Sequence, residues 1–252
     1  MKAQVHDQDK LALVIPTLRE SECLPRLLRE VLPSLGSLNI PCELIVVDDD
    51  SRDGSAKIVE QVSRQDPRVR LIIRRGERGL AGAILHGWQS SDATILGVMD
   101  ADLQHPPQLL PNLFSAIQDG IDLAIASRYA ASGGIQGTHP LRRIVSAASI
   151  AVTLPLLARD RRARDPLSGY FLVRRRCVKN ILFRPTGFKL LLEILVRGRV
   201  RTVREIPFSF GRRAAGRSKA TLRTAWEYLQ LLARLYLLRW RELRLAPRIW
   251  VD

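Results

Sequence analysis

Two carboxylates and an amide follow one another closely near the middle of the chain. In VMDADLQHPP (98–107), Asp100 and Asp102 stand two residues apart, and Gln104 follows two residues later. Carboxylate and amide oxygens are ligands for hard cations such as Mg²⁺ and Mn²⁺, which commonly join a protein to the phosphates of a substrate. The spacing therefore predicts a metal site. The alternative is that the acidic residues cap the helix that Pro106–Pro107 begins.

A second acidic cluster, VVDDDSRDGS (46–55), also follows an apolar run. Its three consecutive aspartates (48–50) repel one another unless hydrogen-bond donors surround them. The ribose and base of a nucleoside are suitable donors. Capping of the next helix by Ser51 or Asp53 would explain only one or two of the acidic residues. We therefore interpret this cluster as a nucleoside site.

Both clusters lie in a part of the chain where short apolar runs alternate with helical patterns. Such alternation is typical of βαβ crossovers and a mostly parallel sheet, whose ligands bind beyond the carboxyl ends of the strands. We expect strands at 11–15, 43–48, 69–74, 94–100 and 122–127, with helices at 21–35, 55–65, 81–89 and 108–119.

The remaining residues have a different pattern, with fewer strands and more helices. We expect helices at 141–158, 176–183, 189–197 and 220–241, strands at 170–174 and 202–208, and a basic loop at 211–219. The predicted fold class is α/β, with a mostly parallel, Rossmann-like sheet, helices on both faces and a basic C-terminal helical extension. We expect one catalytic domain over 1–219 and an amphipathic interface helix and tail over 220–252.

Composition and charge narrow the functional class. The chain has 252 residues, 46% hydrophobic and 26% charged, which excludes collagen-like, coiled-coil and mostly disordered proteins. Residues 1–126 carry 13 basic and 18 acidic side chains, whereas residues 127–252 carry 27 and 7. This asymmetry indicates cation or sugar chemistry in the first half and anion binding in the second. Three scattered cysteines argue against a zinc site and for a reducing compartment. No apolar run reaches the roughly 20 residues of a membrane span.

A series of motifs carries a family resemblance. The segments are IPTLRE (15–20), VVDDDSRDGS (46–55), RRGERGLAGAILHG (74–87), MDADLQHPP (99–107), ASRY (126–129), DPLSGYFLVRR (165–175) and RRAAGRSK (212–219). In this order they resemble the family 2 glycosyltransferases, which have a GT-A fold, and within them the dolichol-phosphate (polyprenyl-phosphate) mannose synthases. The chain departs from the usual family pattern at Leu18–Arg19, where Tyr-Asn is common, and at Ala81 and Tyr170.

The resemblance implies roles for individual positions. Those implied to bind the nucleotide sugar are Pro16, Glu20, Asp48, Asp49, Gly79, Gly82, Asp100 and Lys219. Those implied to hold the metal and diphosphate are Asp100, Asp102 and Gln104. Those implied to bind the phosphate of the acceptor are Arg128, Arg142 and Ser146, while a basic loop with Arg213, Ser218 and Lys219 closes over both substrates. The catalytic set is then Asp102, Arg128 and Arg213.

The arginine assignments also have a physical basis. A guanidinium binds phosphate through two hydrogen bonds, which suits Arg128 at the end of a predicted strand. Arg142 is favoured over Arg143 because it lies one helical turn before Ser146, on the same face. The alternative is that these arginines only keep the surface solvated.

The implied reaction is an inverting transfer of mannose from GDP-mannose to a polyprenyl (dolichyl) monophosphate, with Mg²⁺ or Mn²⁺ as cofactor. We expect a peripheral enzyme on the cytoplasmic face of a membrane. The expected partners are the membrane surface and, as a further candidate, a membrane subunit, but no nucleic acid. One alternative is a polyprenyl-phosphate transferase that uses UDP-glucose or another nucleotide sugar. A second is a non-enzymatic basic module for anionic lipid or nucleic acid, which would have no use for the metal motif.

Overall fold

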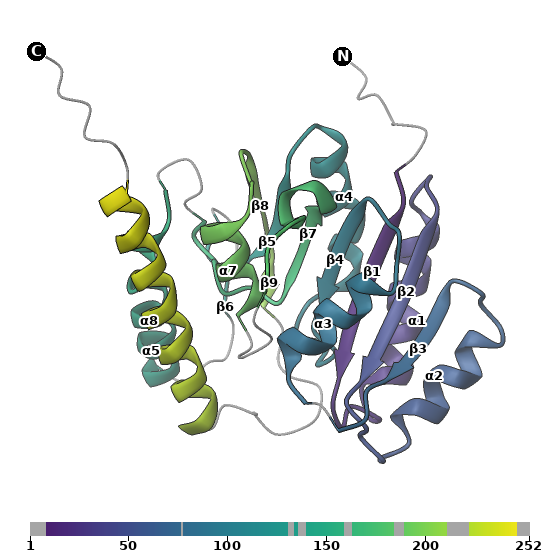
Figure 1. Cartoon of the computed structure of the whole chain (residues 1–252). Helices are drawn as coiled ribbons and strands as arrows, with labels where there is room; N and C mark the ends of the chain where they lie inside the picture. The colour runs from purple at the N-terminus through teal and green to yellow at the C-terminus, as the bar shows by residue number, and fades with distance from the viewer. Residues whose placement is uncertain are drawn as a thin grey trace, which may run out of the picture.

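The computed structural model describes residues 9–76, 78–130, 134–135, 140–158, 163–183, 189–210 and 222–245. Seven strands form one sheet in the order β3-β2-β1-β4-β7-β5-β8 (Figure 1). Their bounds are β1 (Leu11–Thr17), β2 (Cys42–Asp48), β3 (Val69–Ile73), β4 (Ile95–Met99), β5 (Leu123–Ser127), β7 (Tyr170–Arg174) and β8 (Val203–Pro207). A separate parallel pair joins β6 (Gly134–Ile135) to β9 (Ser209–Phe210).

One strand of the sheet runs against the others. β7 lies between β4 and β5 and is antiparallel to both, with Met99 opposite Tyr170 and Leu123 opposite Val173. The other pairings are parallel. The amino end of β7 therefore lies at the edge where β4 and β5 have their carboxyl ends.

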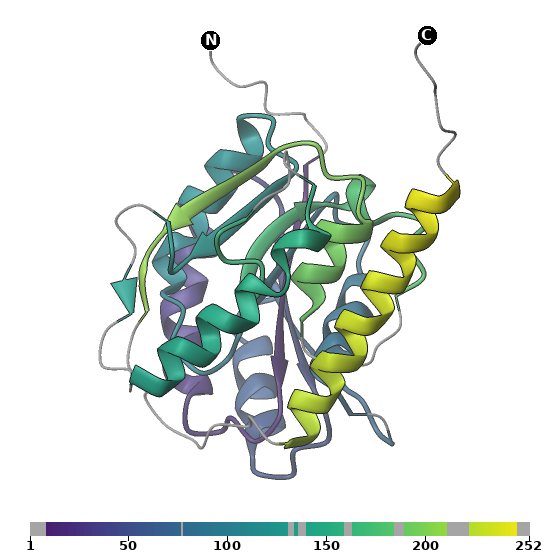
Figure 2. The same cartoon turned by 90° about the vertical axis from the view of Figure 1, so that its left-hand side faces the viewer.

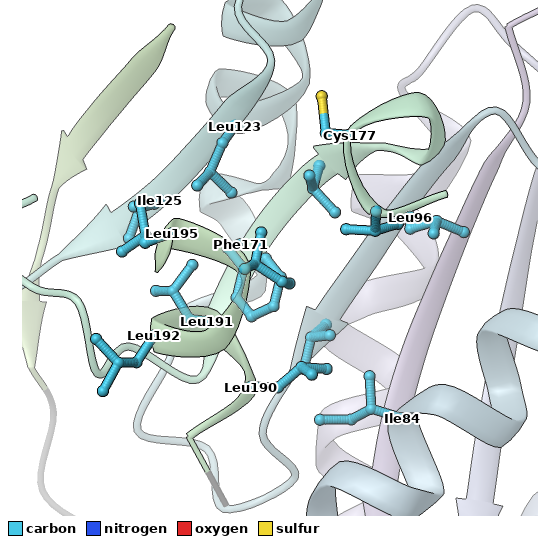
Figure 3. Packing of buried hydrophobic residues seen from close by; sticks show 14 of the residues in the cluster. Ile84, Leu96, Leu123, Ile125, Phe171, Cys177, Leu190, Leu191, Leu192 and Leu195 are labelled. Carbon is cyan, nitrogen blue, oxygen red and sulfur yellow. The ribbon is translucent and has the colours of Figure 1, made fainter. Parts of the chain in front are cut away.

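Helices cover both faces of the sheet, as the sequence predicts. Alternate strand residues point to opposite sides, so the core divides into two clusters. One face packs against α1 (Leu24–Gly36), α2 (Ser55–Ser63) and α4 (Leu110–Gln118). The other packs against α3 (Leu80–Gln89), α7 (Leu190–Arg197) and α8 (Leu222–Leu245). Figure 3 shows Phe171 of β7 near the leucines of α7, with Ile84 of α3 in the same cluster.

Two predicted helices are shorter than expected. The helix predicted at 141–158 ends at Ala151 as α5 (Pro140–Ala151), and a 3₁₀ turn, η2 (Leu154–Leu156), follows. Pro155 lies within that turn and has no N–H for an α-helical hydrogen bond. The helix predicted at 176–183 is only α6 (Arg175–Val178), and Asn180 has a φ of 69°. A further 3₁₀ turn, η1 (Pro107–Leu109), precedes α4.

The C-terminal helix α8 has one packed face and one open face. Its Leu231, Leu232 and Leu235 are buried in the same core cluster as α7. The hydroxyls of Tyr228 and Tyr236 donate hydrogen bonds to main-chain carbonyls at the end of α5 and just after it, at 2.7 and 2.6 Å. Figure 2 shows α8 as a long outer helix. Among the helices that the structure describes, none is both long enough and apolar enough to pass through a bilayer.

Candidate active site

Strained loops gather at the carboxyl edge of the parallel strands. Arg19 follows β1, Asp50 and Arg52 follow β2, and Leu103 follows β4, and all four have φ between 53° and 60°. Side chains other than glycine rarely adopt this left-handed conformation, and such residues cluster at functional sites. In the described part of the chain, Asn180 is the only other residue besides glycines with a positive φ. The motifs that the sequence singled out therefore lie in loops whose shape is specifically imposed.

The two aspartates of the predicted metal site lie in the loop after β4. The main-chain N–H of Gln104 donates to Oδ1 of Asp102 at 3.1 Å, which fixes the turn between them. Gly169, just before β7, lies against Asp100 so closely that an added Cβ would overlap the carboxylate. The carboxylate of Asp100, whose oxygens suit a hard cation, therefore lies directly against the main chain of Gly169.

The donor set fits a divalent cation. In the described residues, no three His, Cys, Asp or Glu side chains gather into a complete metal centre. Mg²⁺ typically takes one or two carboxylates and completes its shell with water and substrate phosphates, so Asp100 and Asp102 with the Gln104 amide meet its needs.

His105 is a neutral neighbour of this loop. Its ring lies between Tyr170, edge-on at 5.9 Å between centroids, and Phe208 at 5.5 Å. Burial lowers the pKa of His105 to about 4, although the nearby Asp102 carboxylate acts in the opposite direction. Nδ1 of His105 is 3.9 Å from Oδ2 of Asp100. His105 therefore supports the loop by packing rather than by carrying a charge.

The acidic cluster after β2 is held by donors from the protein itself. Asp48 accepts hydrogen bonds from the Thr17 hydroxyl at 3.0 Å and from the main-chain N–H and hydroxyl of Ser51 at 2.8 and 2.5 Å. Asp49 accepts from Nε of the buried Arg74 and from the Gly79 N–H, both at 2.8 Å. These bonds replace the nucleoside donors that the sequence suggested for the repelling charges. What Asp48 and Asp49 do in this structure is fix the shape of the loops after β1, β2 and β3.

Glycine is needed at both Gly79 and Gly82 of the predicted nucleotide turn, but for different reasons. Gly79 has a φ of 137°, which a side chain would strain. A Cβ on Gly82 would stand 2.5 Å from Nη1 of Arg74, so Gly82 makes room for that guanidinium. Two further positions implied to bind the nucleotide sugar are buried, Pro16 in β1 and Glu20 in the loop that follows.

Asp53 binds the first residue of α2, but the N-cap residue of that helix is Gly54 and not the predicted Ser51 or Asp53. Asp53 accepts main-chain N–H bonds from Ser21 at 3.1 Å and from Ser55, the first residue of α2, at 3.0 Å. Although burial acts the other way, these bonds lower the pKa of Asp53.

Arg128, directly after β5, is locked onto a buried aspartate. Its Nε and Nη2 donate to the two oxygens of Asp165 at 2.7 Å each, and its main-chain N–H donates to the same carboxylate at 3.1 Å. Burial disfavours the charge of Arg128, but Asp165 raises its pKa overall. The guanidinium also lies 5.4 Å from the ring centroid of Tyr129. The hydroxyls of Tyr129 and Ser146 are 2.8 Å apart, so Ser146 contacts the residue that follows Arg128 in the chain.

Three functional candidates were missed by the sequence reasoning. Asp165 lies in the DPLSG motif, which carried the resemblance but no assigned role. Glu205 on β8 accepts the main-chain N–H groups of Arg164 and Asp165. Lys189 precedes α7 and donates to the Leu167 carbonyl at 3.2 Å.

Lys189 belongs to the electrostatic surroundings of both sides of the site. Loss of solvation lowers the pKa of Lys189 to about 8, the charges of Asp100 and Asp165 oppose that shift, and Arg128 adds to it. A lysine before an apolar helix gives little signal in a sequence, since only the fold brings it to these carboxylates.

Four predicted positions have side chains outside the described part of the structure. Arg142 lies within α5, but its side chain is outside the described part of the structure. Arg213, Ser218 and Lys219 lie outside the described residues altogether. The structure therefore brings together the loop after β4 that carries Asp100 and Asp102, the loops after β2 and β3, Arg128 and Ser146, and the basic loop stays a prediction.

Comparison with known proteins agrees with this arrangement. Residues 12–192 match the model of the family described as glycosyl transferase family 2. The chain is 40% identical over 226 residues to a dolichol-phosphate mannosyltransferase of Pyrococcus furiosus, which covers 90% of this chain and 63% of the relative. It is 38% identical over 207 residues to the enzyme of the same name in Saccharomyces cerevisiae, covering 78% and 75%.

A solved structure shows the same fold at low identity. Glucosyl-3-phosphoglycerate synthase from Mycobacterium tuberculosis, in complex with Mn²⁺, UDP-glucose and phosphoglyceric acid, superposes with a TM-score of 0.68 at 19% identity, over 92% of this chain and 79% of that one. The match to the family model spans most of the chain and includes both acidic loops, Arg128 and the DPLSG segment. The chain belongs to glycosyl transferase family 2.

Proposed function

We propose that the protein transfers mannose, with inversion, from GDP-mannose to a polyprenyl or dolichyl monophosphate. The observation that carries the proposal is the pairing of two unlike sites at one sheet edge. The Asp100–Asp102 loop offers oxygen ligands for a metal–diphosphate group, and Arg128 offers a fixed cation for a phosphate. The names of the relatives from Pyrococcus furiosus and Saccharomyces cerevisiae support this pairing of substrates.

The acceptor side needs charge rather than a strong base. A phosphate monoester has a second pKa of about 6, so its oxygen is already anionic at neutral pH. Arg128 would hold this dianion, and Arg142, Ser146 and Arg213 are proposed to assist. A charge fixed in advance stabilises the approach of two anions without reorganisation. His105 stays neutral and is not needed for proton transfer.

The donor side needs compensation of the charge that the leaving diphosphate gains. Asp100, Asp102 and Gln104 would hold a divalent cation, and such a cation supplies that compensation when bound. Mg²⁺ and Mn²⁺ both suit the donor set. Pro16, Glu20, Gly79 and the loop shaped by Asp48 and Asp49 would receive the nucleoside, with Gly82 behind that loop and Lys219 closing over the donor.

The proposal includes a membrane surface as the place of the reaction, because the acceptor has a lipid tail. We infer a peripheral position on the cytoplasmic face, with α8 as the contact. Trp226, Leu229, Leu237 and Trp240 leave between 50% and 62% of their surface exposed on that helix. Aromatic and aliphatic side chains of this kind suit the bilayer interface. A membrane subunit is a further candidate partner for the same face.

The test combines binding and transfer. We expect calorimetry to give GDP at least about tenfold tighter binding than UDP, a difference of about 1.4 kcal/mol. Transfer from GDP-mannose to dolichyl phosphate should stop with EDTA and return with Mg²⁺ or Mn²⁺. Asp102→Ala should abolish transfer without unfolding the protein.

Each alternative has its own outcome. Equal or tighter binding of UDP would favour a different nucleotide sugar. Full transfer in EDTA would contradict the metal assignment. An exposed charge pair offers a matched control, and Asp119→Ala, which removes a partner of Arg204 far from the loop after β4, should leave transfer unchanged.

A further inference from the structure

The segment Asp165–Gly169 touches both sides of the proposed site. At its start, Asp165 binds Arg128 through three N–H groups. At its end, Gly169 lies against the carboxylate of Asp100. Between them, the Ser168 hydroxyl donates to the Ala126 carbonyl at 2.7 Å, and the Leu167 carbonyl accepts from Lys189. Five consecutive residues thus join the phosphate side to the metal side.

The reversed direction of β7 explains how one short segment can do this. β7 begins at Tyr170, directly after the segment, and lies between β4 and β5. Asp100 follows β4 and Arg128 follows β5, so β7 separates the two strands that carry them. Because β7 is antiparallel, the residues before it emerge where those strands end. A parallel strand at that position would send this segment to the opposite edge.

Glu205 holds the start of the segment from the other side. Its Oε1 and Oε2 accept the main-chain N–H groups of Asp165 and Arg164, each at 3.0 Å. Glu205 lies on β8, opposite Ile125 of β5 in the sheet. The loop that presents Asp165 is therefore fastened to the strand next to the one that presents Arg128.

From these contacts we infer that Asp165 and Glu205 are positioning residues for the acceptor. Asp165 occupies one edge of the Arg128 guanidinium, and the remaining N–H groups keep a fixed direction. Glu205 sets the position of Asp165 through the main chain. Neither residue needs to touch a substrate, and both act through Arg128. This inference rests on the proposed function, in which Arg128 binds the phosphate of the acceptor.

Glu205→Gln is the sharper variant. Asp165→Asn would break the buried ion pair with Arg128 directly, so a loss of transfer could not be assigned to positioning alone. Glu205→Gln retains the shape but offers one acceptor oxygen where the main chain presents two donors. Arg204→Gln is the matched control because Arg204 lies beside Glu205 on β8 and pairs only with the exposed Asp119 among the contacts that the structure describes.

The experiment compares wild type, Glu205→Gln, Arg128→Ala, the double variant and Arg204→Gln in the full chain. We expect Glu205→Gln to raise the acceptor KM or lower kcat about three- to thirtyfold, while the Kd of GDP changes less than about twofold. In the Arg128→Ala background, the same substitution should change transfer less than about twofold, because interacting residues are not additive. Arg204→Gln should behave as wild type. An equal loss in both backgrounds, or a loss of GDP affinity, would overturn the inference.

A direct probe keeps the inference separate from the proposed function. NMR detects the Nε–H of Arg128, which the bond to Asp165 shields from exchange with water. Glu205→Gln should accelerate that exchange at least about fivefold, and Arg204→Gln should not. Unchanged exchange would refute the positioning role whatever the enzyme transfers. Faster exchange in a protein that transfers no mannose to dolichyl phosphate would refute the proposed function and leave the Glu205–Asp165–Arg128 contact standing.

Discussion

Gly169 matters because it has no side chain. Its Cα faces the carboxylate of Asp100, and any side chain there would enter the space of that carboxylate. Interiors transmit such overlaps into their neighbours because they are close-packed. The loop after β4 and the segment before β7 therefore pack so closely that there is no room for one added methyl group between them.

Gly169→Ala tests this contact. We expect transfer to fall more than about tenfold, because Asp100 must move, and the free energy of unfolding to fall by about 1–3 kcal/mol. Gly36→Ala is the control, since its Cβ would stand 3.3 Å from Nη1 at the end of the long Arg68 side chain, and Ala favours a helix. Urea unfolding and initial rates give both values. A wild-type rate in Gly169→Ala would contradict the close match.

At the scale of elements, buried aspartates fasten the ends of strands. Asp122, just before β5, accepts Nη2 of Arg176 and the main-chain N–H of Arg201, both at 2.9 Å. Its own carbonyl accepts the N–H of Arg174 at the end of β7. Burial alone would raise the pKa of Asp122, but these donors lower it. One carboxylate thus joins β5, α6 and the residues before β8.

The lowered pKa of Asp122 gives a pH dependence with a definite sign. A carboxyl whose pKa is lowered by folding stabilises the protein above its unfolded value of about 4, and loses that contribution as the pH falls through the folded value. We expect Asp122→Asn to reduce the free energy of unfolding by about 1–3 kcal/mol at pH 7, and by clearly less near pH 3.

Asp119→Asn is the comparison for Asp122, because Asp119 is exposed and its ion pair with Arg204 should contribute at most about 1 kcal/mol. Urea titrations at both pH values provide the measurement. A difference between wild type and Asp122→Asn that does not shrink in acid would show that the contribution is not electrostatic.

The elements also show how far sequence reasoning reaches. Each predicted strand is present, because an all-aliphatic run such as Leu11–Ile15 is typical of a strand buried on both faces. The loop after β4 and Arg128 could be proposed for the site from the sequence because their side chains follow such strands. The place and direction of β7 were not predicted, since pairing with β4 and β5 depends on contacts distant in the sequence. Asp165, Lys189 and Glu205 were missed for the same reason.

At the scale of the molecule, α8 presents an apolar strip to solvent while its other face completes the core. Trp226, Leu229, Leu237 and Trp240 follow one another at helical spacing on the open side. Oε1 of Glu193 on α7 accepts a hydrogen bond from Nη2 of Arg234 on α8 at 3.3 Å. This bond helps to fix the direction in which the strip faces. Figure 1 shows α8 as the outermost helix on its side of the sheet.

Vesicle binding tests the proposed role of this strip. We expect the protein to bind anionic vesicles, and to bind them less as salt screens its basic half. Trp226→Ser with Leu237→Ser should weaken binding about tenfold or more, since both side chains would lose apolar contact with the lipid. Leu182→Ser is the control, because Leu182 is 81% exposed but lies outside α8. Equal binding by both variants would exclude α8 as the contact.

The place of β7 also governs the order in which a growing chain can fold. β5 pairs with β7 and β8, both of which come later in the sequence, and it does not pair with β4, which comes before it. When β5 leaves the ribosome, it has no neighbour, and the sheet ends at β4 until residues 170–174 emerge. Such non-local pairing is slow and exposes apolar strand edges meanwhile. The insertion of β7, which joins β5 to β4, also brings Arg128 and Asp100 to the same edge, so a nascent chain can acquire the site only after residues 170–174 have paired.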